Sequence, residues 1–216
     1  MSWSSGKDST FALHVAREKL GLHVVGLLTT INSTADRVAM HAVRRTLLDQ
    51  QAAALDLPVH AVELPWPCPN TVYEQQMAAA VQAAREAGVT HMIFGDLFLE
   101  DVRAYRQAML AGTGIEPVFP LWNRPTDALA GDMLESGIRA IITCVDPTQA
   151  PSDLVGRWWD EQLLAQLPAS VDPCGERGEF HTFVVDGPGF TEALDVTIGD
   201  IVHRDGFAFA DVVAAS

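Results

Sequence analysis

The sequence is poor in positive charge: 14 lysine and arginine residues stand against 28 aspartate and glutamate residues, a formal net charge of −14. Residues 1–118 carry a net charge of −3, and residues 119–216 carry −11. Such a surface repels a phosphate backbone, because sequence-independent nucleic-acid binding depends on lysines and arginines that neutralise phosphates. Nucleic acid is therefore not an expected partner.

Cysteine and long apolar runs are also scarce. Cys68, Cys144 and Cys174 are far apart and form no C-x-x-C pair, which argues against a disulfide framework and against a cysteine-built metal site. No run approaches the roughly 20 apolar residues that cross a bilayer. The first residues form no apolar signal segment, so we expect a cytoplasmic protein without a membrane partner. The 48% hydrophobic content is sufficient for a packed core.

Short apolar runs alternate with helical patterns in the first half of the chain. The patterns predict strands at 23–30, 59–64 and 91–94, and helices at 9–20, 38–56, 71–87 and 99–111. This alternation is typical of right-handed βαβ units. It predicts an α/β fold with a parallel sheet and helices on both faces.

After about Pro117 the pattern changes. One helix–strand pair, at 126–136 and 138–145, precedes proline- and glycine-rich loops and β-like runs at 180–185, 194–202 and 207–209. We therefore place a domain boundary near residue 118.

The most informative segment, Ser4-Ser5-Gly6-Lys7-Asp8-Ser9, follows a very short apolar strand at 1–3 and opens the first helix. A loop of small residues that leads into a helix presents unpaired backbone N–H groups and the positive end of the helix dipole, which suit a phosphate. Gly6 lets the backbone approach a ligand closely. The segment is not a Walker loop, and an ordinary turn with Asp8 as N-cap fits the spacing equally well.

Two further segments accompany this loop: Gly95-Asp96 after an expected strand, and Cys174-Gly175-Glu176-Arg177-Gly178-Glu179-Phe180-His181-Thr182, followed by Asp186-Gly187-Pro188. S-G-K-D-S resembles the pyrophosphate-binding loop of the N-type ATP pyrophosphatases. The three segments together resemble the diphthine–ammonia ligase, or diphthamide-synthase-related, ATP-binding family, in its bacterial-type branch. The family usually has a second glycine in this loop, where this chain has Ser5. We therefore expect Ser5 to keep a negative φ.

The resemblance implies a doubly wound parallel sheet of the adenine nucleotide alpha hydrolase (PP-loop) type. Residues 1–118 would form the ATP-binding domain, and residues 119–216 a smaller α+β subdomain for the acceptor.

ATP and Mg²⁺ are the cofactors that the resemblance implies, with Asp96 as the metal ligand. The residues expected to bind ATP are Ser4, Ser5, Gly6, Lys7, Asp8, Ser9, Thr29, Arg37, Gly95 and Asp96. Spacing alone leaves alternatives open. Asp96 is equally a helix N-cap, Thr29 an ordinary strand residue, and Arg37 with His41 a solvated helix face.

A site that joins an amine to a carboxylate needs one group to receive a proton and another to hold the nitrogen. The expected catalytic residues are Asp8, Glu176, Glu179 and His181. The expected acceptor-binding residues are Arg103, Asp146, Gly175, Glu176, Glu179, His181 and Thr182. A polar hairpin turn is the structural alternative for the glutamate-rich segment.

The leading hypothesis is an AMP-forming ligase that adenylates a small-molecule or protein-borne carboxylate and then forms an amide with ammonia or an amine. A homodimer is left open. One alternative is a tRNA-modifying ATP pyrophosphatase, which the negative charge and the missing cysteine pair disfavour. The other is a nucleotide-binding sensor without turnover, which would not need the glutamate-rich segment.

Overall fold

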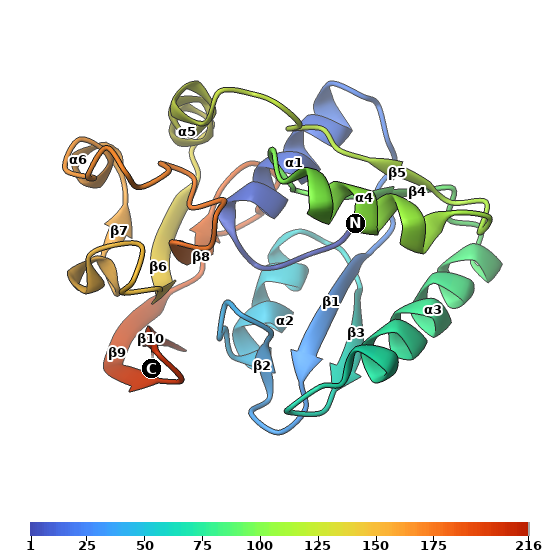
Figure 1. Cartoon of the computed structure of the whole chain (residues 1–216). Helices are drawn as coiled ribbons and strands as arrows, with labels where there is room; N and C mark the ends of the chain where they lie inside the picture. Colours follow the sequence, from blue (N-terminus) through green and yellow to red (C-terminus); the bar gives the residue numbers. More distant parts are fainter. Residues whose placement is uncertain (216) are drawn as a thin grey trace.

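Figure 1 shows the computed structural model of the chain, which describes residues 1–215. In chain order its elements are α1 (Lys7–Glu18), β1 (Leu27–Asn32), β2 (Arg37–Val38), α2 (Arg45–Ala54), β3 (Val59–Leu64), α3 (Asn70–Glu86), β4 (His91–Ile93), α4 (Glu100–Leu110), β5 (Glu116–Val118), α5 (Thr126–Glu135), β6 (Arg139–Val145), η1 (Ser152–Leu154), β7 (Trp158–Trp159), α6 (Glu161–Leu164), β8 (Phe180–Asp186), β9 (Val196–Arg204) and β10 (Phe207–Ala214). The expected α/β architecture with parallel strands is confirmed.

Parallel pairing is confined to the first half of the chain. β1 pairs in parallel with β3, and β4 with β5, while the short β2 runs antiparallel to β1. The segment Met1–Trp3 joins the two parallel pairs. Leu28 N donates to Met1 O and Trp3 N to Leu28 O on one side, and Ser2 N donates to Ile93 O on the other, each at 2.8 Å. In space the order is therefore β3, β1, Met1–Trp3, β4 and β5.

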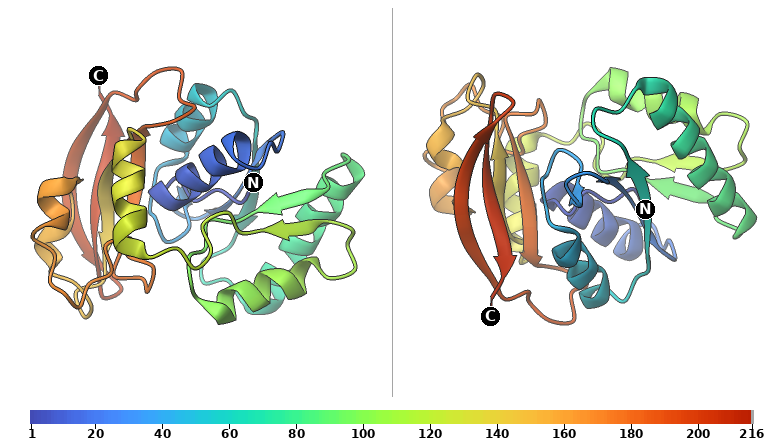
Figure 2. Two further views of the ribbon diagram at one scale, coloured as in Figure 1. Left: turned by 90° about the horizontal axis from the view of Figure 1, so that it is seen from above. Right: turned by 90° about the horizontal axis from the view of Figure 1, so that it is seen from below.

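The second half forms an antiparallel sheet. β6 pairs with β7, β8 and β10, and β9 forms the edge beyond β10. Figure 2 shows this sheet beside the parallel one, with α1 between them. The change of sequence pattern after Pro117 thus corresponds to a change from parallel to antiparallel pairing.

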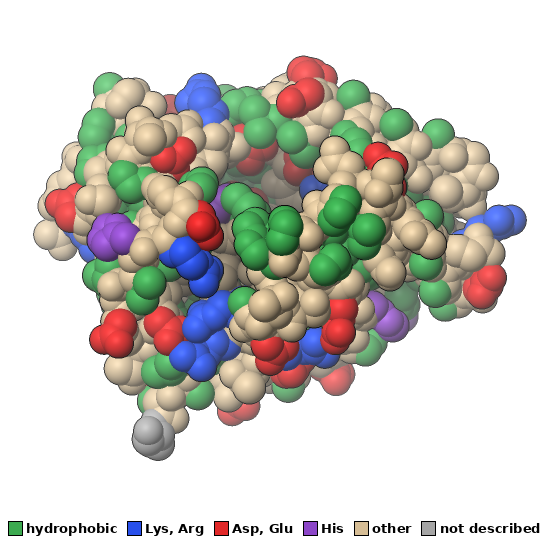
Figure 3. All heavy atoms as spheres, turned by 60° about the horizontal axis from the view of Figure 1, so that its bottom comes forward, with side chains coloured by type: hydrophobic (Ala, Val, Ile, Leu, Met, Phe, Trp, Pro, Cys, Tyr) green, Lys and Arg blue, Asp and Glu red, His purple; other side chains and the backbone are tan. Residues whose placement is uncertain are grey.

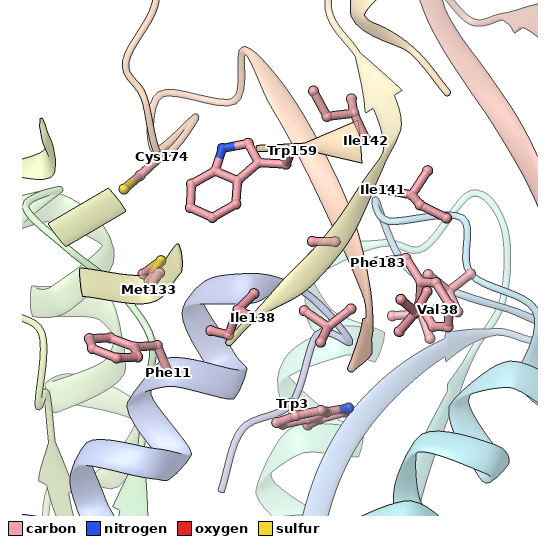
Figure 4. Close-up of a cluster of buried hydrophobic side chains, with 14 of the residues drawn as sticks. Trp3, Phe11, Val38, Met133, Ile138, Ile141, Ile142, Trp159, Cys174 and Phe183 are labelled. Atoms are coloured by element: carbon pink, nitrogen blue, oxygen red, sulfur yellow. The ribbon is translucent and has the colours of Figure 1, made fainter. Parts of the chain in front are cut away.

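One large cluster of buried side chains extends across both halves. Figure 4 shows Phe11 of α1 below Met133 on one side of the cluster, Phe183 of β8 beside Val38 on the other, and Ile138 and Trp3 between them. A smaller cluster, with Val81, Phe94 and Leu110 among its members, packs α3 and α4 against β4. The first cluster contains residues on both sides of position 118, and the expected domain boundary stays a prediction.

The expected helix at 38–56 is wrong in its first turns. Residues 37–38 form β2, and the helix begins only at Arg45. Met40 and Ala42 have φ values of 62° and 55°, which a right-handed helix does not accept. The first strand is also displaced, from 23–30 to Leu27–Asn32. The other expected helices, α1, α3, α4 and α5, lie within two residues of their expected ends, whereas η1 and α6 were not expected.

None of the helices in residues 1–215 is long and apolar enough to cross a bilayer.

Candidate functional site

A pocket of about 490 Å³ opens where the two halves of the chain meet. It is lined by residues of the loop at 4–9, by Leu28 and Thr30 of β1, by Leu64 at the end of β3, by the turn after β2, by Gly95 and Asp96, and by residues 174–176 and 180–182. Figure 3 shows the hollow from its open side, with acidic, basic and histidine side chains around it and hydrophobic ones beside it. The three motifs recognised in the sequence are therefore brought together.

The loop enters α1 through an unusual backbone conformation. Ser5 has a φ of 68°, so the expected negative φ is wrong. Gly6 is the N-cap of α1 and has no side chain to accept from the amides that follow it. An added Cβ at Gly6 would lie 2.8 Å from the ring of His41. Ser5 and Gly6 do not line the pocket, whereas the other four residues of the loop do: Ser4, Lys7, Asp8 and Ser9.

Lys7 and Asp8 form an ion pair at the base of the pocket. The Lys7 side chain is only 2% exposed, and its ammonium group donates to the two Asp8 carboxylate oxygens at 3.1 and 2.9 Å and to the carbonyl of Cys174. Burial lowers the pKa of Lys7, but the Asp8 carboxylate and other negative groups outweigh it, so that its pKa is raised. Burial raises the pKa of Asp8, and this effect exceeds the lowering effect of the Lys7 ammonium.

Gly95 and Asp96 face α1 from the end of β4. A Cβ on Gly95 would lie 3.0 Å from backbone atoms of Asp8 and Ser9, so only glycine allows this approach. Burial raises the pKa of Asp96. Its Oδ2 atom is buried without a hydrogen-bond partner within residues 1–215, with the Arg106 guanidinium 3.7 Å away.

Glu176 connects the glutamate-rich segment to the loop after β4. Its Oε1 atom accepts hydrogen bonds from the backbone amides of Leu97 at 2.7 Å and Phe98 at 3.4 Å. Burial raises the pKa of Glu176 from 4.5 to about 7, and the nearby carboxylates of Asp8 and Asp96 add to the effect. At neutral pH this carboxyl group is able both to accept and to release a proton.

Two histidines that line the pocket lie next to each other, with their ring planes tilted by 40°. The ring centres of His41 and His181 are 4.7 Å apart. His41 Nδ1 lies 2.9 Å from the carbonyl of Thr182, so this nitrogen carries the proton and donates it. Burial lowers the pKa of His41 to about 4 and that of His181 to about 3. Both imidazoles are therefore neutral at pH 7.

Thr182 supports the loop directly. Its buried hydroxyl accepts from the backbone amide of Lys7 at 3.2 Å. Gly175, Glu176, His181 and Thr182 all line the pocket, and their role in binding an acceptor stays a prediction.

Several expected site residues lie outside the pocket. Thr29 is buried on the other face of β1, whereas its neighbour Thr30 lines the pocket. The Arg37 guanidinium pairs with Asp211 of β10 at 2.9 Å, on β2 and not on a helix. Asp146 accepts from the backbone amide and hydroxyl of Thr148 in an exposed turn.

Arg103 and Glu179 are also outside the pocket, although Arg106 and Glu176, three positions away in each case, line it. The Arg103 guanidinium lies over the rings of Phe119 and Trp122, 5.2 and 4.5 Å from their centres. Glu179 is 2% exposed and accepts from the backbone amides of Asp172 and Arg177, so it holds the loop together.

Arg106, Thr30 and His41 line the pocket but are absent from the expected site. Arg106 follows Arg103 by three positions and shares its helix face, which is a signal that the sequence offered. Thr30 offered none, because alternation along a strand does not say which face meets a ligand. For His41 the sequence left open a solvated helix face as the alternative to a place in the site.

The described residues hold no group of three or more His, Cys, Asp or Glu side chains arranged to bind a metal ion.

Comparison with known proteins agrees with the motifs. The family model of the diphthamide synthase N-terminal domain matches residues 1–116, and that of the diphthamide synthase C-terminal domain matches residues 125–213. Proteins named diphthine–ammonia ligase from Bos taurus and Homo sapiens are 34% and 33% identical to the chain over 103 residues.

These alignments cover 45% of this chain and 39% of those relatives, so the chain matches about two-fifths of their length. A protein of the same name from Danio rerio is 25% identical over 230 aligned positions, which cover 97% of this chain and 90% of that protein. Both halves of the chain are thus matched by diphthamide synthase domains. The chain belongs to the diphthamide synthase family.

Proposed function

We propose that the protein is an AMP-forming ligase that uses ATP to convert a carboxylate into an amide. The observation that supports this most directly is the meeting of the loop at 4–9, Gly95–Asp96 and residues 174–182 in one pocket. Because the relatives are named diphthine–ammonia ligase, diphthine and ammonia are the first substrates to test.

In this proposal the fold is the doubly wound PP-loop type, and ATP lies along the carboxyl ends of its strands. The phosphates would rest at the N-terminus of α1, where backbone amides and the helix dipole favour negative charge. Leu28, Met40, Leu64 and Met77 give one side of the pocket an apolar surface for the adenine. Residues 1–118 would then carry ATP, and residues 119–216 the acceptor.

The charge of the pocket fits a nucleotide that arrives with Mg²⁺. Lys7 and Arg106 are offset by Asp8 and Asp96, so the protein alone does not neutralise a polyphosphate. Mg²⁺ binds proteins through one or two carboxylates plus phosphate oxygens and water. The buried Asp96 Oδ2 atom, which has no hydrogen-bond partner among the described residues and faces Arg106 at 3.7 Å, suits this role. Mg²⁺ bound there would neutralise charge on the phosphates.

The reaction would proceed in two transfers. A carboxylate oxygen of the acceptor attacks the α-phosphorus of ATP, and pyrophosphate leaves. Ammonia then attacks the acyl carbon of the adenylate, AMP leaves with the bonding electrons, and one proton is released. Glu176 is the group proposed to receive that proton, because its pKa of about 7 matches the task. His181, neutral at pH 7, would accept a hydrogen bond from the nitrogen or orient it.

An ATP–pyrophosphate exchange assay with radiolabelled pyrophosphate tests this proposal. Exchange that requires a carboxylate acceptor supports the ligase, and exchange that requires tRNA would support the tRNA-modifying alternative. Nucleotide binding without exchange for any acceptor would support the sensor. Asp96→Asn should lower the exchange rate by about 100-fold, as for loss of one group that stabilises phosphate charge. Asp153→Asn, at an exposed position of η1, is the matched control and should leave it unchanged.

A further inference from the structure

Gln51 of α2 is 0% exposed, and its side chain bonds to three separate segments. Its Nε2 atom donates to the carbonyl of Ser5 at 3.1 Å and to that of Val184 in β8 at 2.6 Å. Its Oε1 atom accepts from the indole Nε1–H of Trp3 at 3.2 Å. Both amide donors and the amide oxygen are therefore in use, in a place that water does not reach.

Ser5 is the point of the loop that most needs such support. Its φ of 68° is in the left-handed region, which disfavours every residue with a Cβ compared with glycine. No hydrogen bond of its side chain offsets this cost, because the buried Oγ atom has no hydrogen-bond partner in the part of the chain that the structure describes. What holds Ser5 is its carbonyl, which accepts from Gln51 and from the Val184 amide at 2.9 Å.

The Ser5 carbonyl and the Gly6 amide belong to one planar peptide group. When two donors hold the carbonyl, they also fix the direction of the Gly6 N–H, which points toward Ser4 Oγ at 3.4 Å. The loop therefore keeps its shape without a ligand. A site that is preorganised in this way binds more tightly than one that must be ordered on binding.

We propose that Gln51 is a positioning residue, which holds Ser5 in the left-handed conformation and so keeps the loop ready for the phosphates of ATP. This inference rests on the proposed function. Gln51 lies on the far side of the loop from the ligand and outside the pocket, so it acts only through Ser5.

A merely structural role, in which Gln51 fills the core and satisfies its neighbours, predicts something different. Removal of the amide would then weaken folding, and no change at position 5 would restore the site. Under the positioning role, glycine at position 5 needs no support to adopt the same φ, so Ser5→Gly should rescue the loss.

The test compares Gln51→Met, Ser5→Gly and the double variant with the wild type. Gln50→Met is the matched control, because Gln50 is exposed on the same helix. Calorimetric titration with α,β-methylene-ATP and Mg²⁺ gives the dissociation constant of each. For Gln51→Met we expect the dissociation constant to rise about tenfold, because binding must then restore the left-handed conformation of Ser5. The dissociation constant of the double variant should return to within about twofold of the wild-type value. That of Gln50→Met should equal the wild-type value. Gln51→Asn, which only shortens the amide, serves if the methionine variant does not fold.

Hydrogen exchange of the amides at 4–9 in the ligand-free protein gives a readout that needs no nucleotide. These amides should exchange faster in Gln51→Met and recover in the double variant. If the wild type binds no nucleotide, the proposed function fails, and the exchange comparison still decides the role of Gln51. Unchanged affinity and exchange in Gln51→Met, or a loss that Ser5→Gly does not restore, would overturn the inference.

Discussion

Replacing Glu176 by glutamine should change how the stability of the protein depends on pH. The carboxyl group is partly buried in the pocket, and burial raises its pKa from 4.5 to about 7. Glutamine keeps an oxygen that is able to accept from the backbone amides of Leu97 and Phe98. The substitution therefore removes the titration while it preserves the hydrogen bonds.

The direction follows from the number of protons that each state binds. Between pH 4.5 and about 7 the folded wild type keeps the Glu176 proton that the unfolded chain has lost. The contribution of this proton to the free energy of unfolding is fully present below pH 4.5, and it is lost as the pH rises through 7. At about 1.4 kcal/mol for each pH unit, the interval limits the effect to about 3 kcal/mol. Partial exposure of the side chain reduces the expected effect to about 2 kcal/mol.

Urea denaturation of both proteins at several pH values between about 4 and 8.5 measures this difference. Glu176→Gln should match the wild type at the acid end and be more stable by about 2 kcal/mol at the alkaline end. Glu161→Gln, at an exposed position of α6, controls for the loss of one negative charge. A stability difference between Glu176→Gln and the wild type that does not vary with pH would refute the assigned environment of Glu176. In the ligase reaction the variant should lose amide formation but keep pyrophosphate exchange.

Gly95→Ala should lower the melting temperature, with a cost of about 1–3 kcal/mol, because its Cβ would lie 3.0 Å from the backbone of α1. Gly131→Ala in α5 should not lower it, since no described atom lies within 4 Å of the added Cβ. The ring resonances of His41 and His181 should stay constant from about pH 5.5 to 8 in NMR titrations, because burial holds both pKa values at about 4 or below; a midpoint near 6.5 would show that water reaches them. Asp211→Asn should destabilise the protein by about 1 kcal/mol in low salt, because the two arginines that it pairs with lose their partner. In urea titrations that difference should shrink at high salt, and a loss insensitive to salt would contradict an electrostatic cause.

Patterns that are local in the sequence predicted local structure well. The helical patterns of the sequence located α3, α4 and α5 to within two residues of their ends. The same method extended α2 too far toward the N-terminus. Hydrophobic period does not report the left-handed residues Met40 and Ala42, which end any helix there.

Choices between similar neighbours could not be made from the sequence. Glu176 and Glu179 are the same residue type three positions apart, yet one faces the pocket and the other is buried under the loop. Arg103 and Arg106 pose the same problem on one face of α4, where only Arg106 lines the pocket. In both cases the decision depends on packing against elements far away in the chain.

The family, the alternation of strands and helices, and the contiguous motifs could be identified from the sequence, because each depends on residues that are neighbours in the chain. Tertiary structure alone decided that these motifs share one pocket, that Ser5 has a positive φ, and that Gln51 holds its carbonyl. The physical reason is that burial, hydrogen bonding and pKa shifts depend on which distant segments the fold brings together.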